Sequence, residues 1–138
     1  MCKPKDMIVA FIGAFIGLII VEFTLGWAFL DVFKASPVYA GAGLGGILGF
    51  AIGTALVFGY FFTYMADAMK VKRRWISGFK LGVFFGLIAM LPWTIMAYFL
   101  TTFDFTYIII TTIYGLVEFG VAGLFAMFLL AKFGTKKK

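Results

Sequence analysis

Residues 7–30 read MIVAFIGAFIGLIIVEFTLGWAFL, a run that holds a single charged side chain, that of Glu22. An α-helix rises about 1.5 Å per residue, so this run would span ~36 Å and cross the ~30 Å hydrocarbon core of a bilayer with some tilt. The apolar part of a cleavable signal peptide has only about 7–15 residues. The stretch therefore predicts a retained transmembrane helix.

Three further apolar runs follow, and short polar segments separate them. The composition is 64% hydrophobic and 13% charged, whereas a soluble domain carries about 25% charged residues. A chain of 138 residues cannot hide this much apolar surface in a soluble core. The sequence predicts one all-α domain over residues 1–138, an integral membrane four-helix bundle with helices at about 7–30, 39–65, 76–100 and 106–131.

The basic residues are distributed unevenly among the segments between these runs. The N-terminal tail, the second connection with Lys80 and the C-terminal tail hold eleven of the twelve Lys and Arg residues. The first and third connections hold Lys34 alone. By the positive-inside rule this bias predicts an N-in/C-in topology, and the bacterial inner membrane is the expected location. The net charge of +6 is thereby assigned to membrane topology, and nucleic acid is not an expected partner.

Several chemistries lack the residues they need. The chain has no histidine and one cysteine, Cys2. An internal disulfide and a Ser-His-Asp triad are excluded, and the commonest ligand for haem and zinc is missing. We expect no cofactor, no metal site and no enzymatic activity, although a hydrolase that uses two carboxylates stays formally open.

Glycines recur at intervals of four residues in three of the runs. Residues four apart share a face of a helix, and small residues let membrane helices approach closely. The favoured interpretation is packing within the bundle, and the alternative is that one stripe binds a second copy or a partner. The second run has the longest stripe and is the choice for that alternative. The predicted helix-packing residues are Gly13, Gly17, Gly41, Gly45, Gly49, Gly53, Gly82 and Gly86.

An internal repeat is a further expectation. Gly13 and Gly17 match Gly82 and Gly86 at an offset of 69 residues. Each hairpin would enter and leave on the same side of the membrane, so the repeat would be parallel, about an axis along the membrane normal. The fold would then consist of two tandem helical hairpins.

Two acidic residues, Glu22 and Glu118, lie inside apolar runs. Both fall near the predicted midplane, where an acidic residue costs about 2.5–3.5 kcal/mol on an insertion scale. Intramembrane acids usually face the bundle interior and mark functional sites. No basic residue is expected at this depth. We therefore expect at least one of the two to be protonated at neutral pH, or the pair to share a cation.

Other polar positions fall at a similar depth. Tyr114 and Thr111 precede Glu118 by four and seven residues and share its helix face. Pro92 would free the backbone carbonyl of Ile88 in the third helix. With Thr94, these residues are expected to join the two glutamates in one polar layer. Three roles remain open for it: ties between helices, which are favoured, ion or proton handling, and binding of a ligand or lipid headgroup.

The second half of the chain resembles small bacterial four-helix membrane proteins of unknown function. The resemblance covers residues 75–131 and rests on a W-x-x-G-x-x-x-G start, a mid-helix proline and small residues in the final helix. The residues that carry it are Trp75, Gly78, Lys80, Gly82, Pro92, Tyr98, Gly123 and Ala126. It implies the four-helix fold and no activity.

The predicted function is that of a structural or accessory subunit of a membrane assembly, as a homo-oligomer or in a larger complex. The alternative is a small oligomeric transporter or channel, coupled to protons or cations through Glu22 and Glu118. The second connection is expected to hold anionic lipid at the cytoplasmic face, at about 1 kcal/mol per basic residue. Its candidate headgroup-binding residues are Lys70, Lys72, Arg73 and Arg74.

Overall fold

The structure, a computed structural model, describes residues 3–26, 44–100 and 105–135, and these ranges contain helices and no strand. The elements are α1 (Pro4–Val21), the π-helical turn η1 (Glu22–Gly26), α3 (Leu44–Ala68), α4 (Trp75–Leu100) and α5 (Phe105–Phe133). The helix α1 begins three residues earlier than expected, because Pro4 suits the first turn of a helix, where its missing N–H is not needed.

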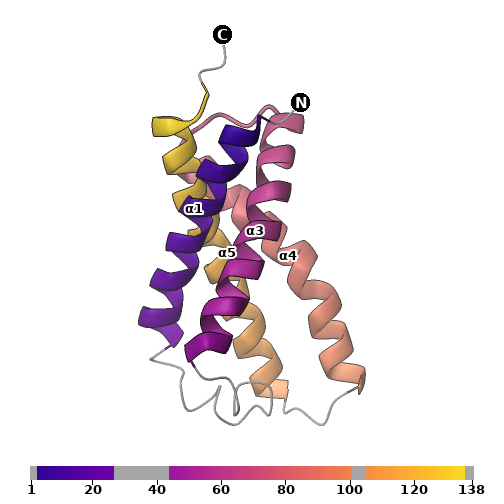
Figure 1. The fold of residues 1–138 in the computed structure, drawn as a ribbon. Coiled ribbons are helices and arrows are strands. Elements are labelled where there is room, and N and C mark those ends of the chain that lie inside the picture. The colour runs from indigo at the N-terminus through magenta and orange to yellow at the C-terminus, as the bar shows by residue number, and fades with distance from the viewer. Residues whose placement is uncertain (1–2, 27–43, 101–104, 136–138) are drawn as a thin grey trace.

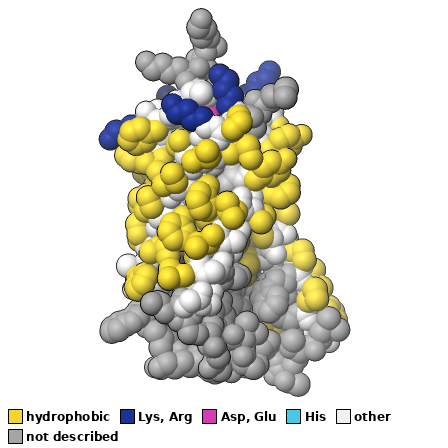
Figure 2. All heavy atoms as spheres, viewed as in Figure 1, with side chains coloured by type: hydrophobic (Ala, Val, Ile, Leu, Met, Phe, Trp, Pro, Cys, Tyr) yellow, Lys and Arg dark blue, Asp and Glu magenta, His cyan; other side chains and the backbone are white. Residues whose placement is uncertain are grey.

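Four helices are long and apolar enough to cross a membrane. The spans are Pro4–Leu25, Ala51–Ala68, Trp75–Met96 and Phe105–Phe133. Large apolar side chains on their outer surfaces are exposed, as Figure 2 shows for one face. The chain is built as a multi-pass helical membrane protein.

The helix α5 is central to the packing. It makes its most extensive contacts with α4 and α1, and α1 also packs against α3, while α3 and α4 barely touch (Figure 1). The start of α1, the connection between α3 and α4 and the end of α5 lie together at one end of the molecule. We call this the terminal end, and Figure 2 shows that Lys and Arg side chains gather there.

Glycines bring α1 and α5 into close contact. A Cβ atom added at Gly13 would lie 2.6 Å from Cα of Ala126, and one added at Gly17 would lie 2.7 Å from Cα of Ala122. No side chain fits in such a gap, so both positions require glycine for the helices to approach this closely.

The same device joins α4 to α5. A Cβ atom at Gly123 of α5 would lie 2.8 Å from Cα of Gly82, and one at Gly86 would lie 3.0 Å from Cβ of Phe119. The structure thus places four of the predicted packing glycines, Gly13, Gly17, Gly82 and Gly86, at contacts with α5.

The stripe on α3 behaves differently. A Cβ atom added at Gly45, Gly49 or Gly53 would meet no atom of the described residues within 4 Å. Gly41, the first glycine of the stripe, lies outside the described residues. Among the described residues these three glycines therefore make no packing contact inside the bundle, and the alternative given for this stripe, a surface for a second copy or a partner, stays a prediction.

An aromatic cluster fills the space between α3, α4 and α5. The ring of Phe58 is 1% exposed and lies 5.0 Å from the ring of Phe85 and 5.7 Å from that of Phe119, centroid to centroid. Phe62 stacks on Phe58 from the next turn of α3, at 5.0 Å. These rings make the contact between α3 and the other two helices, where the backbones stay apart.

Candidate functional sites

The packing of α1 on α5 brings the two membrane glutamates together. Gly13 lies against Ala126 and Gly17 against Ala122. The two helices are therefore antiparallel, and a step of four residues forward on α1 matches a step of four residues back on α5. One more turn sets residue 21 opposite Glu118, with Glu22 beside it. The two carboxyl groups accordingly lie close enough to interact electrostatically.

Glu118 is buried, with 9% of its surface exposed, while Glu22 is half-buried at the start of η1. Tyr114 lies one turn before Glu118 on α5, is also 9% exposed, and interacts through its hydroxyl with Glu22. The structure therefore brings Glu22, Glu118 and Tyr114 of the expected polar layer together.

Thr111 shares this helix face, but its hydroxyl is engaged on its own helix. It donates to the carbonyl oxygens of Tyr107 and Ile108, at 2.9 and 3.1 Å. Within the described residues, no hydrogen bond of Thr111 reaches either glutamate.

Thr94 of α4 contacts a residue that the sequence analysis did not single out. Its hydroxyl oxygen lies 2.8 Å from that of Thr112 on α5, in a hydrogen bond between the two helices. Thr112 is six residues before Glu118 and so lies about 120° around the helix from it. Thr94 thus forms a second polar tie between helices, separate from the glutamates.

Pro92 does not join the polar layer. It is exposed, as are its neighbours on the same side of α4, Ile88 and Leu91, each 54% exposed. The helix directs Thr94 toward α5 and turns Pro92 outward, because residues two apart point to different sides. The expectation that Pro92 lies in the polar layer is wrong for this reason.

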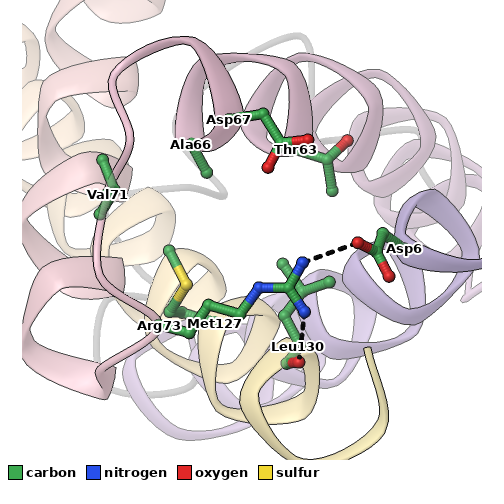
Figure 3. A pocket seen from close by; sticks show the side chains of 8 residues that line it. All are labelled: Asp6, Thr63, Ala66, Asp67, Val71, Arg73, Met127 and Leu130. Atoms are coloured by element: carbon green, nitrogen blue, oxygen red, sulfur yellow. Dashed lines mark hydrogen bonds and ion pairs between the residues drawn. The ribbon is translucent and has the colours of Figure 1, made fainter. Parts of the chain in front are cut away.

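The terminal end holds a polar network that the sequence analysis missed. Arg73 donates from Nη2 to the Asp6 carboxylate at 2.7 Å and from Nη1 to the carbonyl oxygens of Leu130 and Thr135, both at 3.0 Å. Asp6 also accepts from the backbone N–H of Thr135 at 2.7 Å and from its hydroxyl. This network, which we call the terminal clamp, joins α1, the α3–α4 connection and the end of α5 (Figure 3).

The clamp borders a small pocket. Its walls carry both apolar and polar groups, and Figure 3 shows the Arg73 guanidinium extending between Asp6 and Leu130. The lining residues are Asp6, Thr63, Ala66, Asp67, Val71, Arg73, Met127 and Leu130. Thr63 donates to the carbonyl oxygens of Gly59 and Tyr60 in its own helix, both at 2.9 Å.

Arg73 was expected at the lipid headgroups, and the clamp corrects that expectation. The planar fork of an arginine can bind several acceptors at once, here a carbonyl in the last turn of α5, a carbonyl just beyond the helix and a carboxylate. Lys70, Lys72 and Arg74 are exposed, so lipid contact stays a prediction for these three. Nothing in the run Lys72-Arg73-Arg74 shows that the middle residue binds a carboxylate. Asp6, which lies between Lys5 and the first apolar run, is the sequence feature that could have indicated an ion pair at this end.

The described residues contain no group of three or more His, Cys, Asp or Glu side chains that could hold a metal ion. Comparison with known protein families, characterised proteins and solved structures finds no match to this chain. The resemblance to small bacterial four-helix membrane proteins therefore stays a prediction, and the proposals below rest on the chain's own residues.

Proposed function

We propose that the protein is a non-enzymatic membrane subunit, an N-in/C-in four-helix bundle that assembles laterally through α3. The observation that carries this proposal is the glycine stripe Gly45–Gly49–Gly53, where no described residue lies within 4 Å of the added Cβ positions. Phe58 marks the buried side of α3, and Gly49, nine residues earlier, lies about 180° from it around the helix.

A glycine inside a helix destabilises it by about 1 kcal/mol relative to alanine. Three of them on one outward face bring no packing benefit within the chain. Membrane helices associate where small residues allow their backbones to approach. Larger apolar side chains flank the stripe, including Leu56 at 54% and Tyr60 at 51% exposure, and would pack around such a contact. A second copy of the chain is the simplest partner, because the same face then serves both subunits.

The test is self-association of Gly49→Leu in liposomes, followed by energy transfer between labelled copies over a range of protein-to-lipid ratios. We expect wild-type protein to associate and the variant to associate at least tenfold more weakly. The matched control is Ala89→Leu on α4, where an exposed small residue is enlarged outside the stripe. Wild-type protein that stays monomeric at every ratio, or equal loss in both variants, would contradict assembly through α3.

Transport of protons or cations is the second candidate function, and the interacting pair of Glu22 and Glu118 favours it. In the described residues, that pair and the pocket at the terminal end lie in different parts of the molecule. The Phe58 rings fill the space between α3, α4 and α5 with apolar groups. Transport would therefore need a route supplied by an oligomer. A flux of protons or sodium into liposomes that Glu22→Gln and Glu118→Gln together abolish would support it.

A further inference from the structure

Glu118 is a buried acid without a compensating group. Its side chain is 9% exposed, and within the described residues it receives no hydrogen bond and forms no ion pair. Its electrostatic neighbour is Glu22, another acid. A buried carboxylate normally persists only where a hydrogen bond, a basic group or a cation compensates it.

The described part of the chain supplies no basic group for this purpose. Apart from the two glutamates, the charged residues of the helices are Lys5, Asp6, Asp67, Lys80 and Lys132. All but Lys80 lie in the first or last turns at the terminal end, and Lys80, six positions into α4, is exposed. Arg73 is bound to Asp6 and to the end of α5. Among the described residues, the titratable groups around Glu118 are therefore Glu22 on η1 and Tyr114 on α5, and α3 and α4 add none at this depth.

The backbone at this place is also unusual. Glu22 begins the π-helical turn Glu22–Gly26, and the Thr24 hydroxyl donates to the carbonyl of Ile20 at 2.6 Å. Single π-turns inside helices are rare and occur often at functional sites. The turn widens the end of α1 where Glu22 meets α5.

We propose that Glu22 and Glu118 bind one monovalent alkali cation, sodium, in exchange for a proton. The carboxylates and the Tyr114 hydroxyl are hard oxygen ligands, which alkali and alkaline-earth cations prefer. Calcium takes six to eight oxygen ligands and magnesium demands a near-octahedral set. The described residues offer fewer, which favours a singly charged ion that keeps part of its water.

The exchange balances in charge. One carboxyl group releases its proton to water as sodium enters, and the second keeps its proton, so the charge of the site does not change. The site then stays neutral in the low dielectric of the membrane interior in both states. This inference does not depend on assembly through α3, and a monomer would show it.

The test is equilibrium binding of radioactive sodium to the purified full-length protein in nanodiscs. We expect wild-type protein to bind sodium, with an apparent affinity that falls up to tenfold for each unit by which the pH is lowered. Glu118→Gln should weaken binding at least tenfold, and Tyr114→Phe less. Asp67→Asn, which removes a carboxylate at the terminal end, is the matched control and should stay within twofold of wild type.

A second measurement on wild-type protein guards against a variant that fails to fold. Dicyclohexylcarbodiimide modifies protonated carboxyl groups in apolar surroundings, and peptide mapping shows which residue reacts. We expect it to label Glu118 or Glu22, and sodium to slow the labelling where choline does not. Labelling that responds to pH but not to sodium would overturn the cation proposal and leave a proton site, and absence of sodium binding by wild-type protein would overturn it as well.

Discussion

At the scale of single residues, Arg73 carries more interactions than any other basic residue in the described chain. It is 22% exposed, and its partner Asp6 is 6% exposed. Its guanidinium also binds the carbonyl oxygens of Leu130, in the last turn of α5, and of Thr135, just beyond the helix. An arginine in this position fixes three segments of the chain at once, whereas a lysine would supply a point charge without the fork.

We therefore expect Arg73→Ala to lower the free energy of unfolding by about 1.5–3 kcal/mol, the range for hydrogen bonds to a charged group. The measurement is unfolding by sodium dodecyl sulfate in mixed micelles, followed by circular dichroism. Arg74→Ala is the matched control, because this neighbouring arginine is exposed and should change stability by less than about 0.5 kcal/mol. Equal effects of the two substitutions would show that the clamp does not stabilise the fold.

Residue-level prediction from the sequence succeeded where local spacing was enough. Tyr114 and Glu118 are four apart, and a helix places them on one face without reference to any other element. Arg73 depends on Asp6 and Thr135, which are far from it in the sequence and reach it through the packing of three segments. No pattern within the basic run could have shown which residue turns inward.

At the scale of helices, glycine stripes of the same spacing serve different purposes. Gly13 and Gly17 touch the backbone of α5, while Cβ atoms added at Gly49 and Gly53 would have no described residue within 4 Å. The spacing shows that small residues line one face of a helix. Which helix packs against that face depends on the arrangement of the other helices. This is why the sequence located the stripes but left two interpretations open for each, packing inside the bundle or contact with a partner.

The two kinds of glycine should respond oppositely to one added methyl group. Gly17→Ala should destabilise the monomer by about 1–3 kcal/mol, because the new Cβ collides with the backbone of α5. Gly53→Ala should leave it unchanged or raise its stability by about 0.5–1 kcal/mol, because alanine favours the helix and fills open space. Unfolding at protein-to-lipid ratios low enough to keep the chain monomeric measures both, and equal destabilisation would contradict the packing of α3.

At the scale of the whole molecule, the helices depart from the symmetry that a tandem repeat would give. An exact repeat pairs α1 with α4 and α3 with α5. The contact of α5 with α1 would then have a counterpart between α3 and α4, yet those two helices barely touch. The matched glycine pairs of α1 and α4 do share a function, since both pack on α5.

The proposed orientation can be checked with the one cysteine of the chain. If the terminal end is cytoplasmic, a membrane-impermeant thiol reagent should leave Cys2 unlabelled in intact cells and label it after lysis. Ser36→Cys in a Cys2→Ser background places the thiol in the first connection and should be labelled in intact cells. The opposite pattern would reverse the proposed N-in/C-in topology.

The reliance of α1 on α5 has a consequence for biosynthesis. The first helix leaves the ribosome about 100 residues before its main partner, an interval of ~5–20 s at ordinary rates of translation. During that time Gly13 and Gly17 have no α5 to pack on, and Glu22 enters the lipid without Glu118 or Tyr114 beside it. Until α5 is inserted, α1 therefore lies in the membrane without its main packing partner. During that interval it is exposed to membrane proteases and depends on the insertion machinery.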